Sequence, residues 1–119
     1  MVEGGLEKYR TDMARALSII ANHHRKNMQT DKAEEEYKEA LGILRELAKK
    51  IPDVYLPSEA WTLYGLALLY KDKGDLSAAE SAAEESLAKY RIMAVKFPKE
   101  FDEDVADAEK LLAEIRAMR

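Results

Sequence analysis

The sequence of 119 residues contains no cysteine, only two histidines and no long apolar run. Without cysteine the chain has no disulfide bond, no thiolate metal site and no cysteine nucleophile. The longest strongly apolar stretch, residues 65–70, is far too short to cross a bilayer. Residues 1–5 lack the basic and apolar regions of a signal peptide. We therefore expect no membrane association and, by default, a cytoplasmic protein.

An excess of positive charge is also missing. The net charge is −4 at pH 7, whereas a general nucleic-acid binder needs a basic surface that neutralises phosphates. The sequence has no glycine-rich phosphate loop, no nucleophile motif and no paired catalytic carboxylates. We expect no nucleic-acid binding, no enzymatic activity, no catalytic residue and no cofactor.

The adjacent His23 and His24 are candidate ligands of a metal site. Neighbouring residues on a helix point about 100° apart, so both rings cannot easily reach one ion. Zinc sites also need several convergent ligands, and the sequence offers no such cluster. We expect no bound metal and a role for His24 in the core.

What the sequence does contain is a repeat with a period of 46 residues. A fixed period of this length indicates stacked supersecondary units, and such arrays mostly present surfaces to other proteins. The recurring residues are Leu17, Ala21, Ala33, Glu34, Glu39, Leu41, Arg45, Ala48 and Pro52, which return as Leu63, Ala67, Ala79, Glu80, Glu85, Leu87, Arg91, Ala94 and Pro98.

Apolar residues spaced by three and four predict five helices and no strand. We expect helices at about 6–28, 31–51, 58–73, 77–97 and 102–118. Proline disfavours helix at the residue before it, so Pro52 to Pro57 should form a linker. Gly74 and Asp75 should turn the chain. The pairs Asp31 with Glu34 and Ser77 with Glu80 should cap the second and fourth helices.

The two outermost helices should differ in their exposed faces. On the first helix we expect Tyr9, Met13, Leu17, Ile20 and His24 to share one face, and on the fifth we expect an inward stripe of Val105, Ala108, Leu112 and Ile115. The fifth helix aligns one period after the third, with Asp107, Glu109 and Arg116 in place of Trp61, Leu63 and Tyr70. Because terminal units of an array need a polar outer face, the fifth helix should be a cap.

The second unit resembles the tetratricopeptide repeat. It reads Leu63-x-x-Leu66-Ala67-x-x-Tyr70-x-x-x-Gly74-Asp75, followed by Ala79, Ala83 and Leu87, and the first unit fills the same places with Leu17, Ile20, Ala21, His24, Ala33, Tyr37 and Ala40. The long period is similar to the extended repeats of kinesin light chains and of bacterial and archaeal multi-repeat proteins. The resemblance implies an all-α, short right-handed solenoid. It would form one domain, 1–119, with repeat 1 at about 6–51, repeat 2 at about 57–97 and a capping helix at about 102–118.

The resemblance also implies a concave groove that binds a peptide or helix of a partner protein. Its candidate residues by position are Arg15, Ser18, Asn22, Arg25, Lys26, Trp61, Tyr64, Leu68 and Lys71. Trp61 and Tyr64 are candidate anchors, although Trp61 could instead pack against the first helix or the linker. The basic residues could grip a carboxylate or form a solvated face. Asn22 matches the carboxylate-clamp members of the family, but Gly65 stands where they keep a second Asn.

Self-assembly through the ends of the solenoid is the alternative to partner binding. Residues 6–28 carry five basic and two acidic side chains, whereas residues 99–119 carry four basic and seven acidic ones. Opposite charges at opposite ends permit head-to-tail association into a homo-oligomer.

Overall fold

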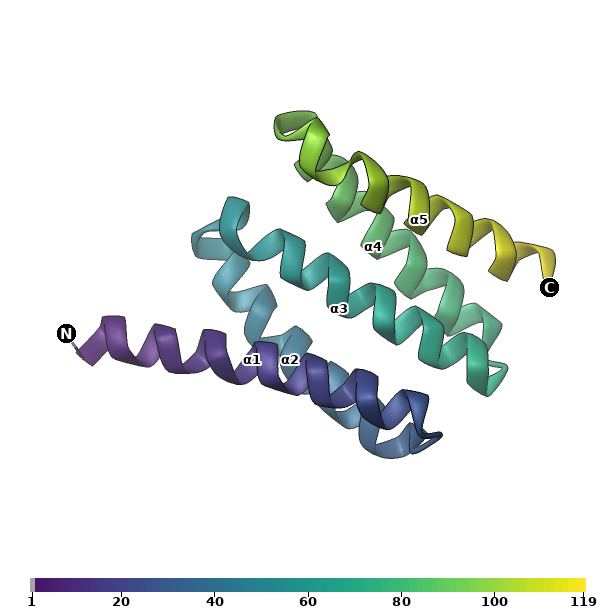
Figure 1. The fold of residues 1–119 in the computed structure, drawn as a ribbon, viewed down its shortest axis with the longest axis horizontal. Helices are drawn as coiled ribbons and strands as arrows, with labels where there is room; N and C mark the ends of the chain where they lie inside the picture. The colour runs from purple at the N-terminus through teal and green to yellow at the C-terminus, as the bar shows by residue number, and fades with distance from the viewer. Residues whose placement is uncertain (1) are drawn as a thin grey trace.

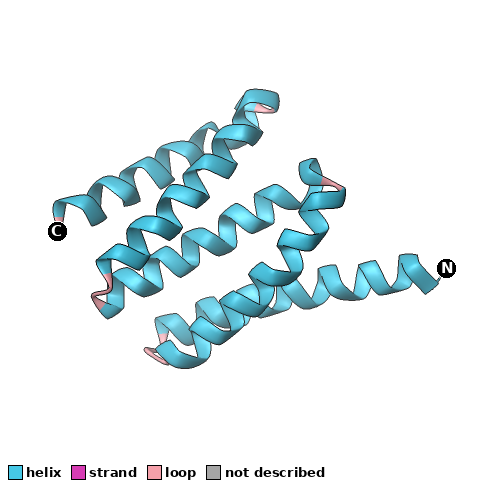
Figure 2. Ribbon diagram, turned by 180° about the vertical axis from the view of Figure 1, so that it is seen from behind, coloured by secondary structure: helices cyan, strands magenta, loops and turns pink. Residues whose placement is uncertain are grey.

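The computed structural model describes residues 2–119, with side chains from Gly5 onward. Its five helices are α1 (Val2–Lys26), α2 (Thr30–Lys50), α3 (Pro52–Lys73), α4 (Leu76–Lys96) and α5 (Pro98–Ala117). They form two layers, with α1, α3 and α5 in front in Figure 1 and α2 and α4 in front when the molecule is seen from behind in Figure 2. The described part of the chain has no strand. The predicted all-α helical repeat is therefore confirmed.

Two helices begin earlier than the sequence analysis predicted. Pro52 and Pro98 are the first residues of α3 and α5, so the expected linker from Pro52 to Pro57 is helical. Proline is tolerated in the first turn of a helix, where its missing N–H would have had no partner. Pro57 lies inside α3, where it removes one backbone hydrogen bond without ending the helix.

The turn between α3 and α4 forms where expected, but the capping pairs do not. Gly74 has a φ of 83°, a left-handed conformation that glycine adopts without a steric penalty. Asp75 then caps α4 by accepting a hydrogen bond from the Ala78 N–H at 3.2 Å. No side chain caps α2. The predicted caps were wrong because Glu34 and Glu80 bind cations instead.

Those two glutamates link successive helices in an equivalent way. Glu34 on α2 accepts hydrogen bonds from Tyr70 and Lys73 at the end of α3. One period later, Glu80 on α4 accepts hydrogen bonds from Arg116 and Arg119. An electrostatic link between helices therefore recurs with the same period as the apolar core.

The pKa of Glu34 is lowered to about 2, chiefly by Lys73, then by Lys38 and Tyr70. A carboxylate whose pKa falls on folding stabilises the fold above its unfolded pKa, near 4.5, and this contribution is lost as the pH falls towards 2. We expect Glu34→Gln to lower the free energy of unfolding by about 1 kcal/mol at pH 7. The deficit should shrink below pH 4.5 in urea titrations at pH 7, 4 and 2.5.

The exposed Glu39→Gln, on the same helix, serves as a control for the Glu34 prediction and should behave like the wild-type protein. A deficit for Glu34→Gln that stays constant down to pH 2.5 would contradict the assignment of the stabilisation to the ionised carboxylate.

The core forms between neighbouring helices. One cluster joins α1, α2 and α3, and the largest joins α3, α4 and α5. Small residues lie where helices approach closely: Ala21, Ala33, Ala67 and Ala79 are fully buried. The inward stripe of α5 is as expected, with Ala108, Leu112 and Ile115 buried and Val105 half-buried.

The apolar face predicted for α1 is largely uncovered. The structure buries Ala14, Ser18 and Ala21, whereas Tyr9 is 64% exposed and Ile20 is 44% exposed. In α3, the equivalent Tyr55 and Leu66 are buried. The difference arises because α3 packs against α2 on this face, whereas the structure places no helix against the corresponding face of α1.

Candidate functional site

The predicted binding residues all lie on α1 and α3, which are neighbours in the layer of α1, α3 and α5 (Figure 1). Cavities between these helices define one face of the layer. We call it the odd-helix face. Trp61 of α3 lies at its centre and lines two small cavities. The first cavity, which we call the slot, has a volume of about 140 Å³. It is lined by Arg15, Ser18, Ile19, Leu44, Ser58, Trp61 and Thr62. The second cavity, which we call the aromatic pocket, has a volume of about 160 Å³. It is lined by Trp61, Tyr64, Tyr90, Asp104 and Asp107.

Trp61 is only partly covered by its neighbours. It shares the slot with Arg15 and Ile19 of α1, yet 43% of its surface stays exposed, and Ile19 is 63% exposed. The Trp61 side chain therefore borders the same cavity as α1, in line with the alternative that it packs near the first helix. It still presents an apolar surface to solvent.

Ser18 is the one predicted residue that the structure removes from the surface. It is 2% exposed, and its hydroxyl lies 2.9 Å from the Thr62 hydroxyl. Thr62 in turn donates to the Ser58 carbonyl at 2.8 Å. Ser18 thus joins α1 to α3 beneath the slot.

Asn22 and Arg25 are held by a tyrosine from the other layer. The Tyr37 hydroxyl donates to Asn22 Oδ1 and accepts a hydrogen bond from Arg25 Nε at 3.2 Å. Burial raises the pKa of Tyr37. Arg25 also lies 4.0 Å from Asp72, so it is braced from two sides, whereas Lys26 is exposed.

The remaining predicted residues lie on α3, towards α5. Tyr64 and Leu68 are half-buried against the α3–α4–α5 cluster. Lys71 pairs with Glu114 of α5 at 3.4 Å. Burial raises the pKa of Asp104, and the nearby Asp107 raises it further. The odd-helix face is therefore basic on α1, aromatic and apolar on α3, and acidic on α5.

The two histidines lie outside this face's cavities, and His24 is not a core residue. Its Nδ1 lies 2.7 Å from Glu36 Oε1 and its side chain is 20% exposed. His23 bonds to Asn27 at 3.0 Å. Among the residues whose side chains the structure describes, 5–119, no three histidine or acidic side chains converge as a metal site would require. None of the described helices is both long and apolar enough to cross a bilayer.

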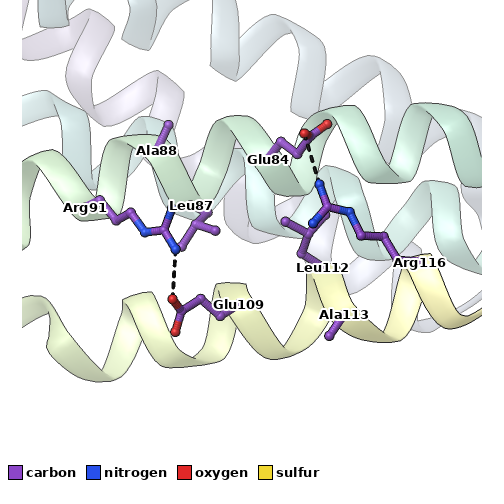
Figure 3. Close-up of a pocket in the computed structure, with 8 residues that line it drawn as sticks. All are labelled: Glu84, Leu87, Ala88, Arg91, Glu109, Leu112, Ala113 and Arg116. Atoms are coloured by element: carbon purple, nitrogen blue, oxygen red, sulfur yellow. Dashed lines mark hydrogen bonds and ion pairs between the residues drawn. The ribbon is translucent and has the colours of Figure 1, made fainter.

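A larger groove on another side of the molecule was missed by the sequence analysis. It has a volume of about 630 Å³ and lies between α4 and α5 (Figure 3). Two ion pairs cross it, Arg91 with Glu109 at 2.8 Å and Arg116 with Glu84 at 3.2 Å. Glu109 and Arg116 therefore point towards α4, and not onto the outer face of α5 as predicted.

The same groove occurs one period earlier. Leu87, Arg91 and Leu112 of the groove between α4 and α5 correspond to Leu41, Arg45 and Leu66 of a groove with a volume of about 450 Å³ between α2 and α3. There, α4 adds a further wall through residues such as Ala82. Comparing positions 46 residues apart would have found both grooves from the sequence.

Comparison with known proteins gives one match. The model of the family described as the tetratricopeptide repeat matches residues 12–92, which is more than half of the chain and covers most of α1 together with α2, α3 and most of α4. No curated protein and no solved structure matches. Both the paired helices of the fold and this match lead to the same assignment: the chain belongs to the tetratricopeptide repeat family.

Proposed function

We propose that the protein is a non-enzymatic interaction module whose odd-helix face binds a peptide or helix of a partner protein. The family generally mediates protein–protein interactions. The observation that carries the proposal for this chain is Trp61, a large ring that is 43% exposed and lies between two cavities. Partly exposed tryptophan beside a pocket is typical of the anchors that dominate binding energy.

The charges of the face support a partner with a defined orientation. Arg15 and Lys26 lie on α1, whereas Asp104 and Asp107 lie on α5. A segment that crosses the helices would therefore pair its acidic end with α1 and its basic end with α5. Complementary charges of this kind fix register and direction more than they add affinity.

We expect Trp61→Ala to weaken binding at least tenfold. The measurement is selection of a random dodecapeptide phage library on the wild-type protein, followed by affinity measurement of an enriched peptide with each variant. Arg15→Glu should weaken the same peptide by reversing the charge beside the slot. Both variants should keep the helical circular dichroism of the wild-type protein, because both side chains are exposed.

The control for this experiment is Ile92→Ala, which removes a 50% exposed apolar side chain from α4, in the other layer. It should bind like the wild-type protein. Peptides that bind Trp61→Ala and Arg15→Glu as tightly as the wild-type protein would refute the odd-helix face as the binding site.

Self-association is a second candidate, and the exposed stripe of α1 favours it. Leu6, Tyr9 and Ile20 of α1 are 56%, 64% and 44% exposed. Tyr9 and Ile20 correspond to Tyr55 and Leu66, with which α3 packs against α2. A second copy of this chain suits this face, because the basic α1 of one copy and the acidic α5 of another attract each other.

The test of self-association is the molar mass in sedimentation velocity at low salt. Tyr9→Glu should reduce an oligomer to a monomer, whereas Val95→Glu, at a residue of α4 that is 85% exposed, should not. A monomeric wild-type protein at high concentration would exclude this candidate.

A further inference from the structure

We propose that the aromatic pocket of the odd-helix face is a cation pocket that takes the side chain of a lysine from the bound partner. The inference deepens the proposed function and rests on it, because it names the chemistry of a residue that the partner must present. It concerns the pocket between α3, α4 and α5 that is lined by Trp61, Tyr64, Tyr90, Asp104 and Asp107.

The walls of the pocket combine aromatic rings with carboxylates. Trp61 and Tyr64 come from α3 and Tyr90 comes from α4. Asp104 and Asp107 are three residues apart on α5, so they lie on the same side of that helix. Aromatic faces attract ammonium groups through their quadrupole, and more strongly when the site is partly desolvated. The carboxylates add a full negative charge at the same place.

The carboxylates and the Tyr90 hydroxyl of the pocket make no polar side-chain contacts of their own within the described part of the chain. Among residues 5–119, whose side chains the structure describes, no hydrogen bond or ion pair joins Asp104 or Asp107 to another side chain. Tyr90 is only 4% exposed, and no hydrogen bond joins its hydroxyl to another group in this part of the chain. No buried side-chain oxygen or nitrogen among these residues lacks a partner, so the Tyr90 hydroxyl reaches solvent at the pocket and can accept a hydrogen bond from an incoming donor.

The hydroxyl of Tyr90 and the two carboxylates act on one another. Burial raises the pKa of Tyr90, and the negative charges of Asp104 and Asp107 raise it further. Asp107 likewise raises the pKa of Asp104 and of Tyr64. These groups therefore surround a single region of negative potential, and a bound cation would relieve the repulsion between them.

The equivalent pocket of the preceding repeat shows that the fold does not require this chemistry. Subtracting 46 from the five lining positions gives Arg15, Ser18, Leu44, Ser58 and Trp61, all of which line the slot. The slot, which is the equivalent cavity one repeat earlier, is thus lined by no carboxylate and no phenol. The carboxylates of Asp104 and Asp107 and the phenols of Tyr64 and Tyr90 therefore belong to the second pocket alone.

The chemistry of the pocket selects among ligands. Two carboxylates repel an anion, and a neutral apolar side chain would leave them and the Tyr90 hydroxyl without partners. The pocket volume of about 160 Å³ suits an ammonium group with part of its methylene stem. Lysine provides both, and its three N–H donors match two carboxylates and a phenol oxygen.

The test uses the full chain and small probes followed by NMR. N-acetyl-lysine methylamide should shift the Trp61 indole N–H resonance in a saturable way, whereas N-acetyl-norleucine methylamide, with a similar stem and no charge, should not. The Asp104→Asn/Asp107→Asn double variant should bind the lysine probe about fivefold or more weakly. Asp102→Asn makes the same type of change at an exposed position of α5 and should have no effect.

Two results would overturn the lysine assignment. Equal shifts with the norleucine probe would make the pocket an apolar one, and tighter binding of N-acetyl-arginine methylamide would assign it to a guanidinium group. Trp61→Leu provides a second check, because it keeps an apolar side chain but removes the ring. Trp61 is the single tryptophan of the sequence, so binding to this variant is followed through the backbone amide resonances of Asp104 and Asp107. If it binds the lysine probe as the wild-type protein does, the aromatic contribution is refuted.

The phage selection separates this inference from the proposed function. Enriched peptides that need Trp61 and share a lysine support both. Enriched peptides that need Trp61 but bind equally well to the Asp104→Asn/Asp107→Asn variant would overturn the cation pocket and leave the binding face intact. A selection without any enriched peptide, together with saturable binding of the lysine probe, would refute the peptide-binding face and retain the cation pocket.

Discussion

Deleting residues 98–119 is expected to leave a chain that aggregates. Its helical circular dichroism signal should fall by more than the loss of α5 alone would explain. This segment contains α5, which buries Ala108, Leu111, Leu112 and Ile115 against its neighbours. Its loss would expose Leu87 and Tyr90 of α4, which are 5% and 4% exposed in the intact chain. Contiguous apolar surface of this kind promotes association of chains.

Leu66 is not the residue that the deletion would uncover, although its alignment with Leu112 suggests it. It lies in the cluster between α2 and α3 with Leu41 and Leu63, and this cluster stays intact in the truncated chain.

In a helical repeat, stability is approximately a sum of unit and interface terms. The truncation therefore removes one interface and should weaken α4 most. A soluble, monomeric truncated chain with the full helical signal of α1 to α4 would contradict the role that we propose for α5 as a cap.

A point variant tests the same interface in the complete chain. Ile115 is fully buried, and Ile115→Ala should cost about 2–5 kcal/mol of the free energy of unfolding, measured in urea. Lys110→Ala, at an exposed position of the same helix, should change it by no more than about 0.5 kcal/mol. Equal effects of the two variants would mean that α5 is not packed on α4 as described.

The arrangement of the helices was predictable because two periods coincide in the sequence. Apolar spacing identified five helices and the buried face of α5, and the 46-residue period identified equivalent positions between hairpins. Gly74 marked its turn because only glycine adopts the left-handed conformation there at no cost. The exposure of the α1 stripe could not be predicted from the sequence of that helix, because an amphipathic stripe is buried only where a neighbouring helix covers it.

Helix starts and caps were less predictable than helix faces. Proline signals the end of a helix and its first turn equally well, so Pro52 and Pro98 could not decide between a linker and a start. Glu34 and Glu80 have the spacing of capping residues, yet each has stronger partners in lysine or arginine side chains of a later helix. Local patterns contain no information about such contacts between distant residues.

The candidate site was predictable as a set of positions and not as a set of contacts. The period placed Arg15, Trp61 and Asp107 at equivalent positions, which is why they line equivalent cavities. It could not indicate that Ser18 bonds to Thr62 or that Asn22 accepts a hydrogen bond from Tyr37. The first contact depends on the spacing of α1 and α3 within one layer, and the second depends on the distance between the two layers.

Gly65→Ala is expected to destabilise the protein by about 1 kcal/mol net, against the usual preference of helices for alanine. A Cβ at this position would lie 2.7 Å from Tyr37 Cε1 and 2.9 Å from Cζ. Tyr37 is fully buried and its hydroxyl is bonded to Asn22 and Arg25, so the ring has little freedom to move. Overpacking costs about 1–3 kcal/mol, which exceeds the gain of about 1 kcal/mol from replacing a helical glycine.

Gly42→Ala provides the matched control for this substitution. Gly42 lies inside α2 and is exposed, and a Cβ added there would meet no neighbouring atom within 4 Å. The variant should therefore gain about 0.5–1 kcal/mol, so that the two glycine substitutions have opposite signs in urea denaturation. Stabilisation by both would show that the Tyr37 ring yields to the added methyl group.

The next repeat solves the same packing problem with the sizes exchanged. One period on, Tyr37 becomes Ala83 and Gly65 becomes Leu111, and both are buried in the cluster that includes α4 and α5. A large residue on one helix thus faces a small one on the other in both repeats. We expect Gly65→Leu alone to be more damaging than Gly65→Ala, and the double variant Tyr37→Ala/Gly65→Leu to recover much of that loss. A double-mutant cycle in urea would measure the coupling, and purely additive effects would mean that the two positions do not share one space.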